Sequence, residues 1–423
     1  MPRTARFAAT LALVPAVERF PDLPLVEPDL DGLSSADARL ATAIHRTVIQ
    51  RWLTLDHLLK RHLKQPPRKM AAETYAVLLG GAAQLVFMDR LPAYAVIDES
   101  VRLTHAFDVP RTSGVVNAVL RKIAEAVDGP SEEPWTPGAD RLPAADRTTI
   151  KLKGNLLPKP DNLLTHLVVA TSHPMPLLQR WFKEHGRERA TALALQSLQS
   201  PPTFVVEGER ATRWQGSHAE LLDWLAADTS RRVQDPASLA SVAALGDLSL
   251  TPKTILDLCA GRGTKTRQLQ HVFPAAAITA HDPDDGRRAD LEQIPGITVA
   301  EPEPDQRFDL IVLDVPCSNT GVLARRPGAR YRATDASIGS VVALQREIAG
   351  RALGHLAPGG VVLYCTCSIE AKENQEQARW IAEQGEGLAV WKEATILPES
   401  GQAEGSDGHD GSYHAVVGPT PSD

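Results

Sequence analysis

Hydrophobic residues recur at helical spacing through the first 127 residues of the chain. Between residues 40 and 59 they return every three or four positions, at Leu40, Ile44, Val48, Trp52, Leu55, Leu58 and Leu59. Ser34 stands where a helix N-cap is expected. Similar patterns cover residues 71–88, 93–107 and 114–127, and no strand pattern interrupts them. Residues 1–127 are therefore predicted to form an all-α domain.

The pattern of hydrophobic and polar residues changes twice between residues 128 and 250. Residues 128–165 are polar and rich in proline, which favours a linker or an irregular insertion. Residues 166–250 mix a helical pattern at 173–198 with a short strand pattern at 203–208, which predicts a small α+β subdomain.

Strands and helices alternate over residues 251–423. Short apolar runs cover residues 254–260, 276–282, 308–316 and 359–367. Runs of this kind are typical of parallel strands that are buried on both faces. We expect a doubly wound, Rossmann-like α/β domain, in which ligands bind at the carboxyl ends of the strands.

Composition narrows the classes of function. The 423 residues carry a formal net charge of -7, which argues against indiscriminate nucleic-acid binding but allows a local basic patch. None of the four cysteines forms a C-x-x-C pair, so we expect no metal. No apolar run is long enough to span a membrane. The N-terminus faintly resembles a signal peptide, but Glu18 and Arg19 stand where a cleavage site would be. We therefore expect a cytoplasmic monomer.

The first two strands of this domain end in residues that suit a nucleoside cofactor. A glycine turn follows the first strand, made of Cys259, Ala260, Gly261, Arg262, Gly263, Thr264 and Lys265. Glycines at a strand-to-helix turn let the backbone approach a ligand closely. Asp282 ends the second strand, where an acid can bind ribose hydroxyls. Each feature alone could be a simple turn, but together they favour a nucleoside site.

Three cysteines and an acid lie at the ends of the other two strands. Asp314 and Cys317 come after one strand, and Cys365 and Cys367 end the next. A thiolate that adds to carbon 6 of cytosine makes carbon 5 able to attack an electrophilic methyl group. An acid at ring nitrogen 3 assists the addition. Cys365 fits the ordinary role of a buried, small apolar side chain.

These motifs resemble those of the RNA cytosine-5 methyltransferases that use S-adenosylmethionine. The stretches VQDPASLAS, DLCAGRGTKT, LDVPCSNTGV and YCTCSIEAKEN follow one another in that family's order. RLPAYAVIDESVRL and GVVNAVLRKIAE are similar to a NusB-like RNA-binding domain. The resemblance implies a class I methyltransferase domain that acts on ribosomal RNA of the small subunit.

The resemblance also implies roles for individual residues. Cys367 would attack carbon 6, Cys317 would assist release of the product, and Asp314 would hydrogen-bond or protonate the cytosine. The glycine turn with Lys265 would hold the methionine portion of the cofactor, with Asp314 also at the cofactor site. Asp282 would bind the ribose, and Glu301 would contact the adenine.

The glycine turn departs from the pattern that the family usually shows. Arg262 stands where the family has proline, and Thr264 stands where it has glycine. A β-branched threonine would be a poor occupant of a position that needs positive φ. This departure favours an alternative function, a degenerate domain that only binds RNA.

Four arginines that follow the Pro-Cys-Ser stretch are the candidate RNA contacts: Arg325, Arg326, Arg330 and Arg332. A charged run of this kind is otherwise a solvated face. The same chemistry on transfer RNA stays open as a second alternative. A nicotinamide dehydrogenase would leave the cysteine motifs unexplained.

Overall fold

The computed structural model describes residues 4–420 except 25, 229, 247, 386 and 402–406. The chain divides into two compact units. The helical unit comprises Met1–Ser200 and Arg326–Thr334, and the α/β unit comprises Pro201–Arg325 and Asp335–Asp423. The division therefore falls at residue 200, inside the segment 166–250 that was expected to form one subdomain.

The four helices predicted within the first 127 residues are confirmed. They are α2 (Ser35–Lys60), α3 (Ala72–Phe87), α4 (Ala93–Ala106) and α5 (Ser113–Ala126). Helix α1 (Ala5–Arg19) precedes them, and short 3-10 turns lie at Pro67–Lys69 and Pro110–Thr112. Ser34 caps α2, since its side chain accepts a hydrogen bond from the backbone nitrogen of Asp37. Helix α3 is central, packing against the other four helices.

The proline-rich segment contains strands that the sequence analysis did not predict. Strands β1 (Val127–Pro134), β2 (Arg141–Pro143) and β3 (Thr148–Leu152) form an antiparallel sheet in the order β1-β3-β2. The prolines Pro130 and Pro134 lie on β1, an edge strand, where proline removes no ladder hydrogen bond that the sheet needs. Helices α6 (Leu163–Ala170), α7 (Met175–Gln196) and α12 (Ala329–Arg332) complete this unit.

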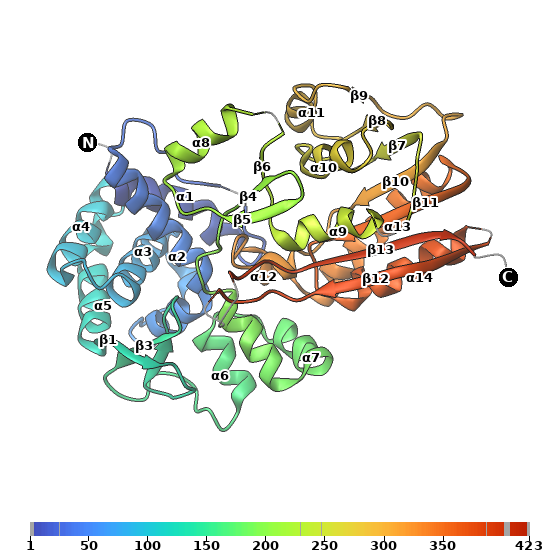
Figure 1. The fold of residues 1–423 in the computed structure, drawn as a ribbon. Coiled ribbons are helices and arrows are strands. Elements are labelled where there is room, and N and C mark those ends of the chain that lie inside the picture. Colours follow the sequence, from blue (N-terminus) through green and yellow to red (C-terminus); the bar gives the residue numbers. More distant parts are fainter. Residues whose placement is uncertain are drawn as a thin grey trace. The chain divides into compact units, whose positions relative to one another are not determined.

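A seven-stranded sheet forms the centre of the α/β unit (Figure 1). Its strands are β7 (Thr254–Asp257), β8 (Ala277–Ala280), β9 (Ile297–Val299), β10 (Phe308–Asp314), β11 (Leu356–Thr366), β12 (Leu388–Ile396) and β13 (Ser412–Pro419). Their order is β12-β13-β11-β10-β7-β8-β9. Strands β7 to β11 are parallel, and β13 runs antiparallel between β11 and β12. The predicted doubly wound fold and its four predicted strands are confirmed.

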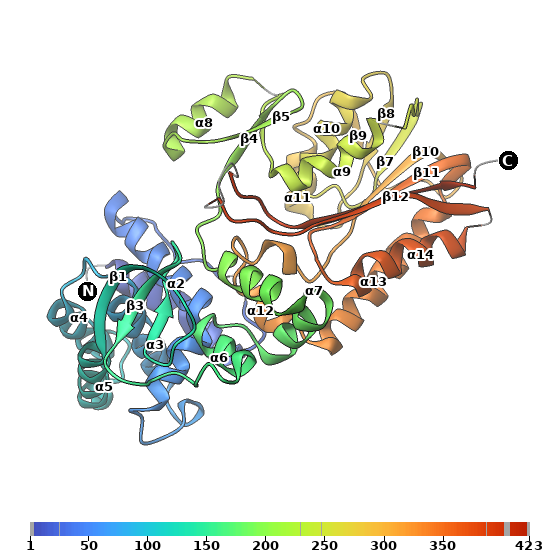
Figure 2. The same cartoon turned by 60° about the horizontal axis from the view of Figure 1, so that its bottom comes forward.

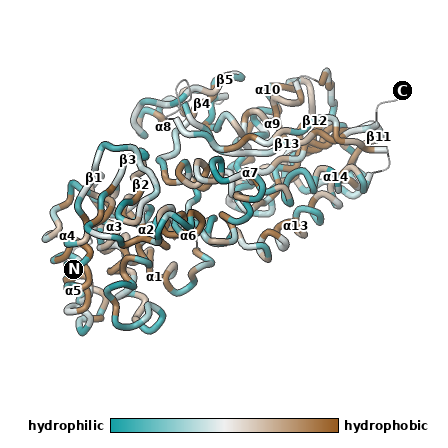
Figure 3. Tube along the Cα trace, turned by 90° about the horizontal axis from the view of Figure 1, so that it is seen from below, coloured by the Kyte–Doolittle hydropathy of each residue, from teal (hydrophilic) through white to brown (hydrophobic). Residues whose placement is uncertain are grey.

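Apolar side chains on both faces of the central strands explain why these strands are buried. On β10, Ile311 and Leu313 face α13 (Asp335–Leu353) and α14 (Gln375–Gln384). The alternate residues Leu310 and Val312 face the layer of α9 and α10. Helix α9 spans Pro236–Gly246 and α10 spans Thr264–Val272. Figure 2 shows the two helical layers on opposite faces, and Figure 3 shows the apolar character of the central strands.

The remaining elements of the α/β unit lie outside the main sheet. They are β4 (Phe204–Glu207), β5 (Arg210–Arg213), β6 (Arg232–Val233), α8 (His218–Ala226) and α11 (Asp285–Leu291), with 3-10 turns at Thr320–Val322 and Ala371–Glu373. The first three strands form a small sheet in the order β5-β4-β6, which confirms the strand predicted at 203–208. None of the helices in the described part of the chain has the length and apolar character of a membrane span.

Candidate active site

In the turn between β7 and α10, the two residues with positive φ are both glycines. Gly261 has φ of +57° and Gly263 has φ of +83°. A Cβ on Gly263 would lie 2.2 Å from the side chain of Ile294, so only glycine fits there. Thr264 is the first residue of α10, outside the positive-φ positions. The substitution of threonine for glycine at this position therefore causes no backbone strain.

The space above this turn suits a bound nucleoside cofactor. A Cβ placed on Gly261 would meet no atom within 4 Å. The side chain of Arg262 is 76% exposed and pairs with Asp290, so it lies away from the buried floor of the turn. The backbone amides at the start of α10 and the open face at Gly261 fit the carboxylate-bearing methionine portion of S-adenosylmethionine.

Asp282 connects the ends of β7 and β8. Its Oδ2 accepts a hydrogen bond from the backbone nitrogen of Gly261 at 3.0 Å, and its Oδ1 accepts one from the backbone nitrogen of Asp284 at 3.1 Å. The carboxyl group is thereby fixed beside the glycine turn. This position is compatible with the predicted contact to ribose.

Asp257, at the end of β7, is a buried acid that the sequence analysis did not single out. Its Oδ2 accepts a hydrogen bond from Thr266 Oγ1 at 2.7 Å, and its Oδ1 has no partner among the described residues. Burial raises the pKa of Asp257 to about 7. The residue supports the first turn of α10 from beneath the glycine turn.

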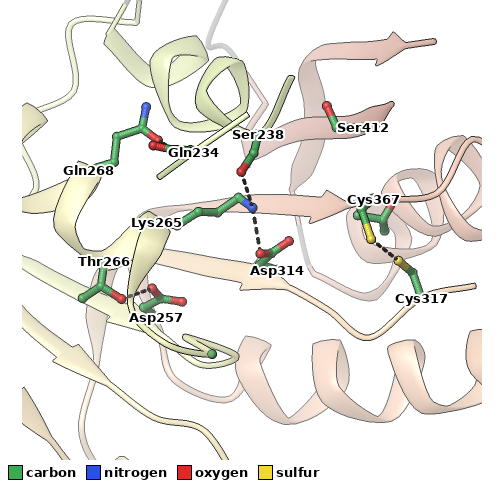
Figure 4. Close-up of polar contacts among 12 residues, drawn as sticks. Gln234, Ser238, Asp257, Lys265, Thr266, Gln268, Asp314, Cys317, Cys367 and Ser412 are labelled. Atoms are coloured by element: carbon green, nitrogen blue, oxygen red, sulfur yellow. Dashed lines mark hydrogen bonds and ion pairs between the residues drawn. The ribbon is translucent and has the colours of Figure 1, made fainter. Parts of the chain in front are cut away.

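Lys265 and Asp314 form an ion pair at the carboxyl ends of β7 and β10 (Figure 4). Lys265 Nζ lies 2.7 Å from Asp314 Oδ2 and 3.4 Å from Ser238 Oγ. Burial alone would lower the pKa of Lys265, but the Asp314 carboxylate raises it above its usual value. A protonated lysine therefore faces the acid that the family resemblance assigned to the cytosine.

The two cysteines of the predicted chemistry lie side by side. Cys317 Sγ is 3.1 Å from Cys367 Sγ, although 50 residues separate them in sequence. They come from the loops that follow β10 and β11, as Figure 4 shows. The hydrogen bond with Cys367, together with burial, raises the pKa of Cys317 well above its usual value. Both effects favour the protonated thiol form of Cys317.

The other two cysteines are poor candidates for a nucleophile. Burial raises the pKa of Cys259 to about 12 and that of Cys365 to about 12. Cys365 is 1% exposed and packs in the apolar layer beneath α9 and α10. Its expected role as a packing residue agrees with this position.

A buried carboxylate holds the two cysteine loops together. Glu373 accepts hydrogen bonds from the backbone nitrogen of Ser318 at 2.7 Å and from Ser368 Oγ at 2.8 Å. The hydroxyl of Ser318 also donates to it. Ser318 and Ser368 directly follow Cys317 and Cys367. Glu373 was visible in the stretch YCTCSIEAKEN, but its role depends on a loop 55 residues away.

Backbone contacts add a second connection between the loops. The nitrogen of Gly321 donates to the carbonyl oxygen of Cys367 at 3.0 Å, and its carbonyl accepts from the nitrogen of Gly411 at 2.7 Å. A Cβ on Gly321 would lie 2.7 Å from the Cys367 oxygen. Glycine is therefore required where the three loops meet.

The structure contradicts the prediction that Arg325 is a free phosphate contact. Its guanidinium pairs with Asp235 at 3.1 Å and with Asp410, and it donates to the carbonyl of Pro202 at 2.6 Å. Both carboxyl groups are less than a tenth exposed. Burial raises the pKa of Asp410 to about 6. Arg325 thus stabilises two buried acids of the protein itself.

The prediction for Arg330 is also wrong. The residue belongs to the helical unit and is fully buried. Its guanidinium donates to four backbone carbonyls, those of Gln50, Thr171, Ser197 and Pro327. A buried guanidinium needs such acceptors, and its burial keeps it out of reach of RNA. The sequence around Arg330 does not reveal its burial, because burial depends on tertiary contacts.

The other sequence-based assignments stay predictions. Arg326 is exposed, and Arg332 Nη1 lies 3.9 Å from Asp22 Oδ1. Glu301 follows β9 and forms an exposed ion pair with Arg351 at 2.9 Å. Its expected contact to adenine would require that pair to open.

Two segments of the chain match known protein families. Residues 248–403 match the family described as 16S rRNA methyltransferase RsmB/F, and residues 9–125 match the NusB family. Ribosomal RNA small subunit methyltransferase B of Erwinia tasmaniensis is 26% identical over 407 residues, covering 90% of each chain. The protein of that name from Escherichia coli O6:K15:H31 is 26% identical over 453 residues, covering 98% of each chain.

The crystal structure of PH0851 shares the fold, with a TM-score of 0.68, 17% identity and 99% of each chain covered. The family match covers strands β7 to β12, the glycine turn and both cysteine loops described above. Residues 248–403 therefore resemble the RsmB/F methyltransferases, a region similar to the NusB family precedes them in the chain, and the protein is an S-adenosylmethionine-dependent methyltransferase.

Proposed function

We propose that this protein methylates carbon 5 of a cytosine in small-subunit ribosomal RNA through a covalent adduct on Cys367. The observation that carries the proposal is the 3.1 Å contact between the sulfurs of Cys317 and Cys367. The Lys265–Asp314 pair lies at the same carboxyl edge of the sheet. The substrate class follows from the names of the matched family and relatives.

Cys367 is the nucleophile in this proposal. Its sulfur forms a bond to carbon 6 of cytosine, and the displaced π electrons move through carbon 5 and the ring toward nitrogen 3. Asp314 hydrogen-bonds or protonates nitrogen 3 and so favours the addition, and the protonated Lys265 that donates to it is the source of this proton. Lys265, which is held protonated, fixes the carboxyl group of Asp314 in place.

When bound, S-adenosylmethionine supplies a methyl group on a positively charged sulfur, toward which carbon 5 of the adduct is nucleophilic. The glycine turn and Asp282 would hold this cofactor next to Asp314. After methylation the Cys317 thiol gives its proton to the leaving Cys367 sulfur, the thiolate it becomes accepts the proton of carbon 5, and the double bond between carbons 5 and 6 re-forms as the Cys367–carbon 6 bond breaks. Cys317 assists this release, because its thiol is adjacent to the leaving sulfur.

The degenerate, RNA-binding alternative rests on Arg262 and Thr264. Neither residue occupies a positive-φ position. The arrangement of the glycine turn therefore supports an active enzyme. The alternative of a transfer RNA substrate is tested by including transfer RNA in the same assay.

The test uses unmodified small-subunit ribosomal RNA and S-adenosylmethionine labelled in the methyl group. The native protein should yield labelled 5-methylcytosine. Cys317→Ala should accumulate a protein–RNA adduct that resists denaturant, whereas Cys367→Ala should give neither label nor adduct. Cys365→Ala is the matched control, because it removes a thiol in the apolar core and should retain methylation. Labelled product from Cys367→Ala would contradict the proposed nucleophile.

A further inference from the structure

A basic cavity of about 350 Å³ lies in the α/β unit, separate from the cysteine loops. It is lined by residues of β6 and α10 and of nearby loops, namely Arg232, Arg267, His271, Gln270, Ser230 and Pro295. None of the described residues that line this cavity is acidic. We refer to it as the Arg232 pocket.

The guanidinium of Arg232 is fixed in this pocket by a chain of buried hydrogen bonds. Arg232 Nε donates to Gln234 Oε1 at 2.7 Å, and Gln234 Nε2 donates to Gln268 Oε1 at 2.8 Å. Gln268 Nε2 in turn donates to the backbone oxygen of Leu239 at 2.8 Å. Gln234 and Gln268 appear together in Figure 4. The side chain of Arg232 is therefore held before any ligand binds.

One donor group of this fixed guanidinium is unused. Arg232 is 6% exposed, and its buried Nη2 atom has no hydrogen-bond partner among the described residues. A buried donor without an acceptor costs free energy, and a buried cation without a counter-charge costs more. The fold therefore keeps an uncompensated positive charge at Arg232, a residue that helps to line the cavity.

A second guanidinium increases the positive charge of the pocket. Arg267 is half-buried and forms no side-chain hydrogen bond or ion pair with any described residue. Burial, and then the charge of Arg267, lower the pKa of Arg232. The two side chains therefore repel one another in the absence of an anion. His271 adds a further ring nitrogen at the exposed rim.

We propose that the Arg232 pocket binds a phosphodiester group of the RNA substrate. The oxygens of a phosphate in the cavity can accept from the guanidinium of Arg267, and the positive charge of Arg232 beside them attracts the anion. The inference rests on the proposed function, because it assigns the anion to RNA. Helix α10 also carries Lys265, so one helix presents both this pocket and a residue of the reaction site. Phosphate contacts of this kind position a nucleic acid without reading its sequence.

The test measures RNA affinity as a function of salt, without turnover. Arg267→Gln should weaken binding of a small-subunit RNA fragment about tenfold at low salt. The slope of log K against log salt concentration should become shallower by about 0.7, the value for one lost phosphate contact on single-stranded RNA. Methylation at saturating RNA should keep its kcat, while the KM for RNA rises. His271→Gln should act in the same direction more weakly.

Arg307→Gln is the matched control. It removes the same charge from an exposed arginine at the amino end of β10, whose guanidinium donates to the backbone carbonyls of Pro304 and Gln306. An equal loss of RNA affinity in Arg267→Gln and Arg307→Gln would show that only the net charge of the protein matters, and it would overturn the inference. An unchanged affinity and slope in Arg267→Gln would also overturn it.

A second arm titrates inorganic phosphate into the native protein and Arg267→Gln by calorimetry. Phosphate binding that depends on Arg267, together with unchanged RNA affinity, would assign the pocket to a free anion and overturn the inference. Binding of S-adenosylhomocysteine checks that each variant is folded. If the native protein binds RNA with the expected salt slope but forms no 5-methylcytosine, the proposed function fails and the assignment of the pocket to RNA phosphate stands.

Discussion

The carboxylate of Glu373 accepts a hydrogen bond from the backbone nitrogen of Ser318 at 2.7 Å. This contact fixes the loop that carries Cys317 against the loop that carries Cys367. Because the same carboxylate also accepts from Ser368, the separation of the two sulfurs depends on a group that takes no part in the chemistry.

Glu373→Gln should therefore impair catalysis through position. Glutamine offers one acceptor oxygen where the carboxylate offers two, so its NH2 group faces either the Ser318 nitrogen or the two serine hydroxyls, which weakens this buried network at a cost of about 1–3 kcal/mol in the free energy of unfolding. Denaturant unfolding measures this cost, and adduct formation measures the effect on Cys367. Glu376→Gln on the exposed face of α14 should change neither quantity. A Glu373→Gln enzyme with native stability and native adduct yield would show that the hydrogen bonds of Glu373 to the two cysteine loops are dispensable.

Asp314→Asn should lower kcat by about 10²–10⁴-fold, the usual contribution of a positioned acid. The amide keeps the shape of the side chain but cannot supply a proton to nitrogen 3. The measurement is single-turnover methyl transfer at saturating RNA and cofactor. Asp285→Asn, an exposed acid near the start of α11, serves as the control. If Asp314→Asn raised only the KM for RNA, Asp314 would bind the base without acting as an acid.

Stability should fall as pH rises from about 4 to about 7 because of Asp257. Its pKa in the folded protein is about 7, above the ordinary value of 3.8, so the folded state binds this proton more tightly than the unfolded state does. The contribution is fully present at low pH and is lost as pH approaches the folded pKa. Its size is on the order of a few kcal/mol.

The measurement compares native protein with Asp257→Asn by denaturant unfolding between pH 5 and pH 8. The difference in free energy of unfolding should move in favour of the native protein as pH falls. Asp410, whose pKa is raised to about 6, is present in both proteins, so its contribution to the free energy of unfolding cancels in the difference. A difference that does not change with pH would exclude Asp257 as the source.

Arg325→Met should destabilise the protein by about 3 kcal/mol or more. The substitution leaves the buried carboxyl groups of Asp235 and Asp410 without their cation, and breaking a buried pair is costly. Arg307→Met, at an exposed site, should be close to neutral. A loss of RNA affinity at native stability would instead restore the original prediction of a phosphate contact at Arg325.

Periodicity and local motifs were sufficient for helices α2 to α5 and for four of the five parallel strands, but the short strand β9 was not predicted. They failed at β1, where proline usually excludes a strand but is accepted on an edge. They also failed at Arg330, which sequence places in a charged run and the fold surrounds with carbonyl groups. Side chains that act on a distant loop, such as Glu373, carry no local signal of their role.

The Gly321 contacts with Cys367 and Gly411 are made entirely by main-chain atoms. Every amino acid except proline offers the same nitrogen, and every amino acid offers the same oxygen. Substitutions at position 367 thus leave its acceptor oxygen in place, whereas a side chain at 321 or at 411 would clash with a neighbouring loop. In a library of all single substitutions, the geometry around Cys367 should be robust to change at most positions and should fail abruptly at Gly321 and Gly411.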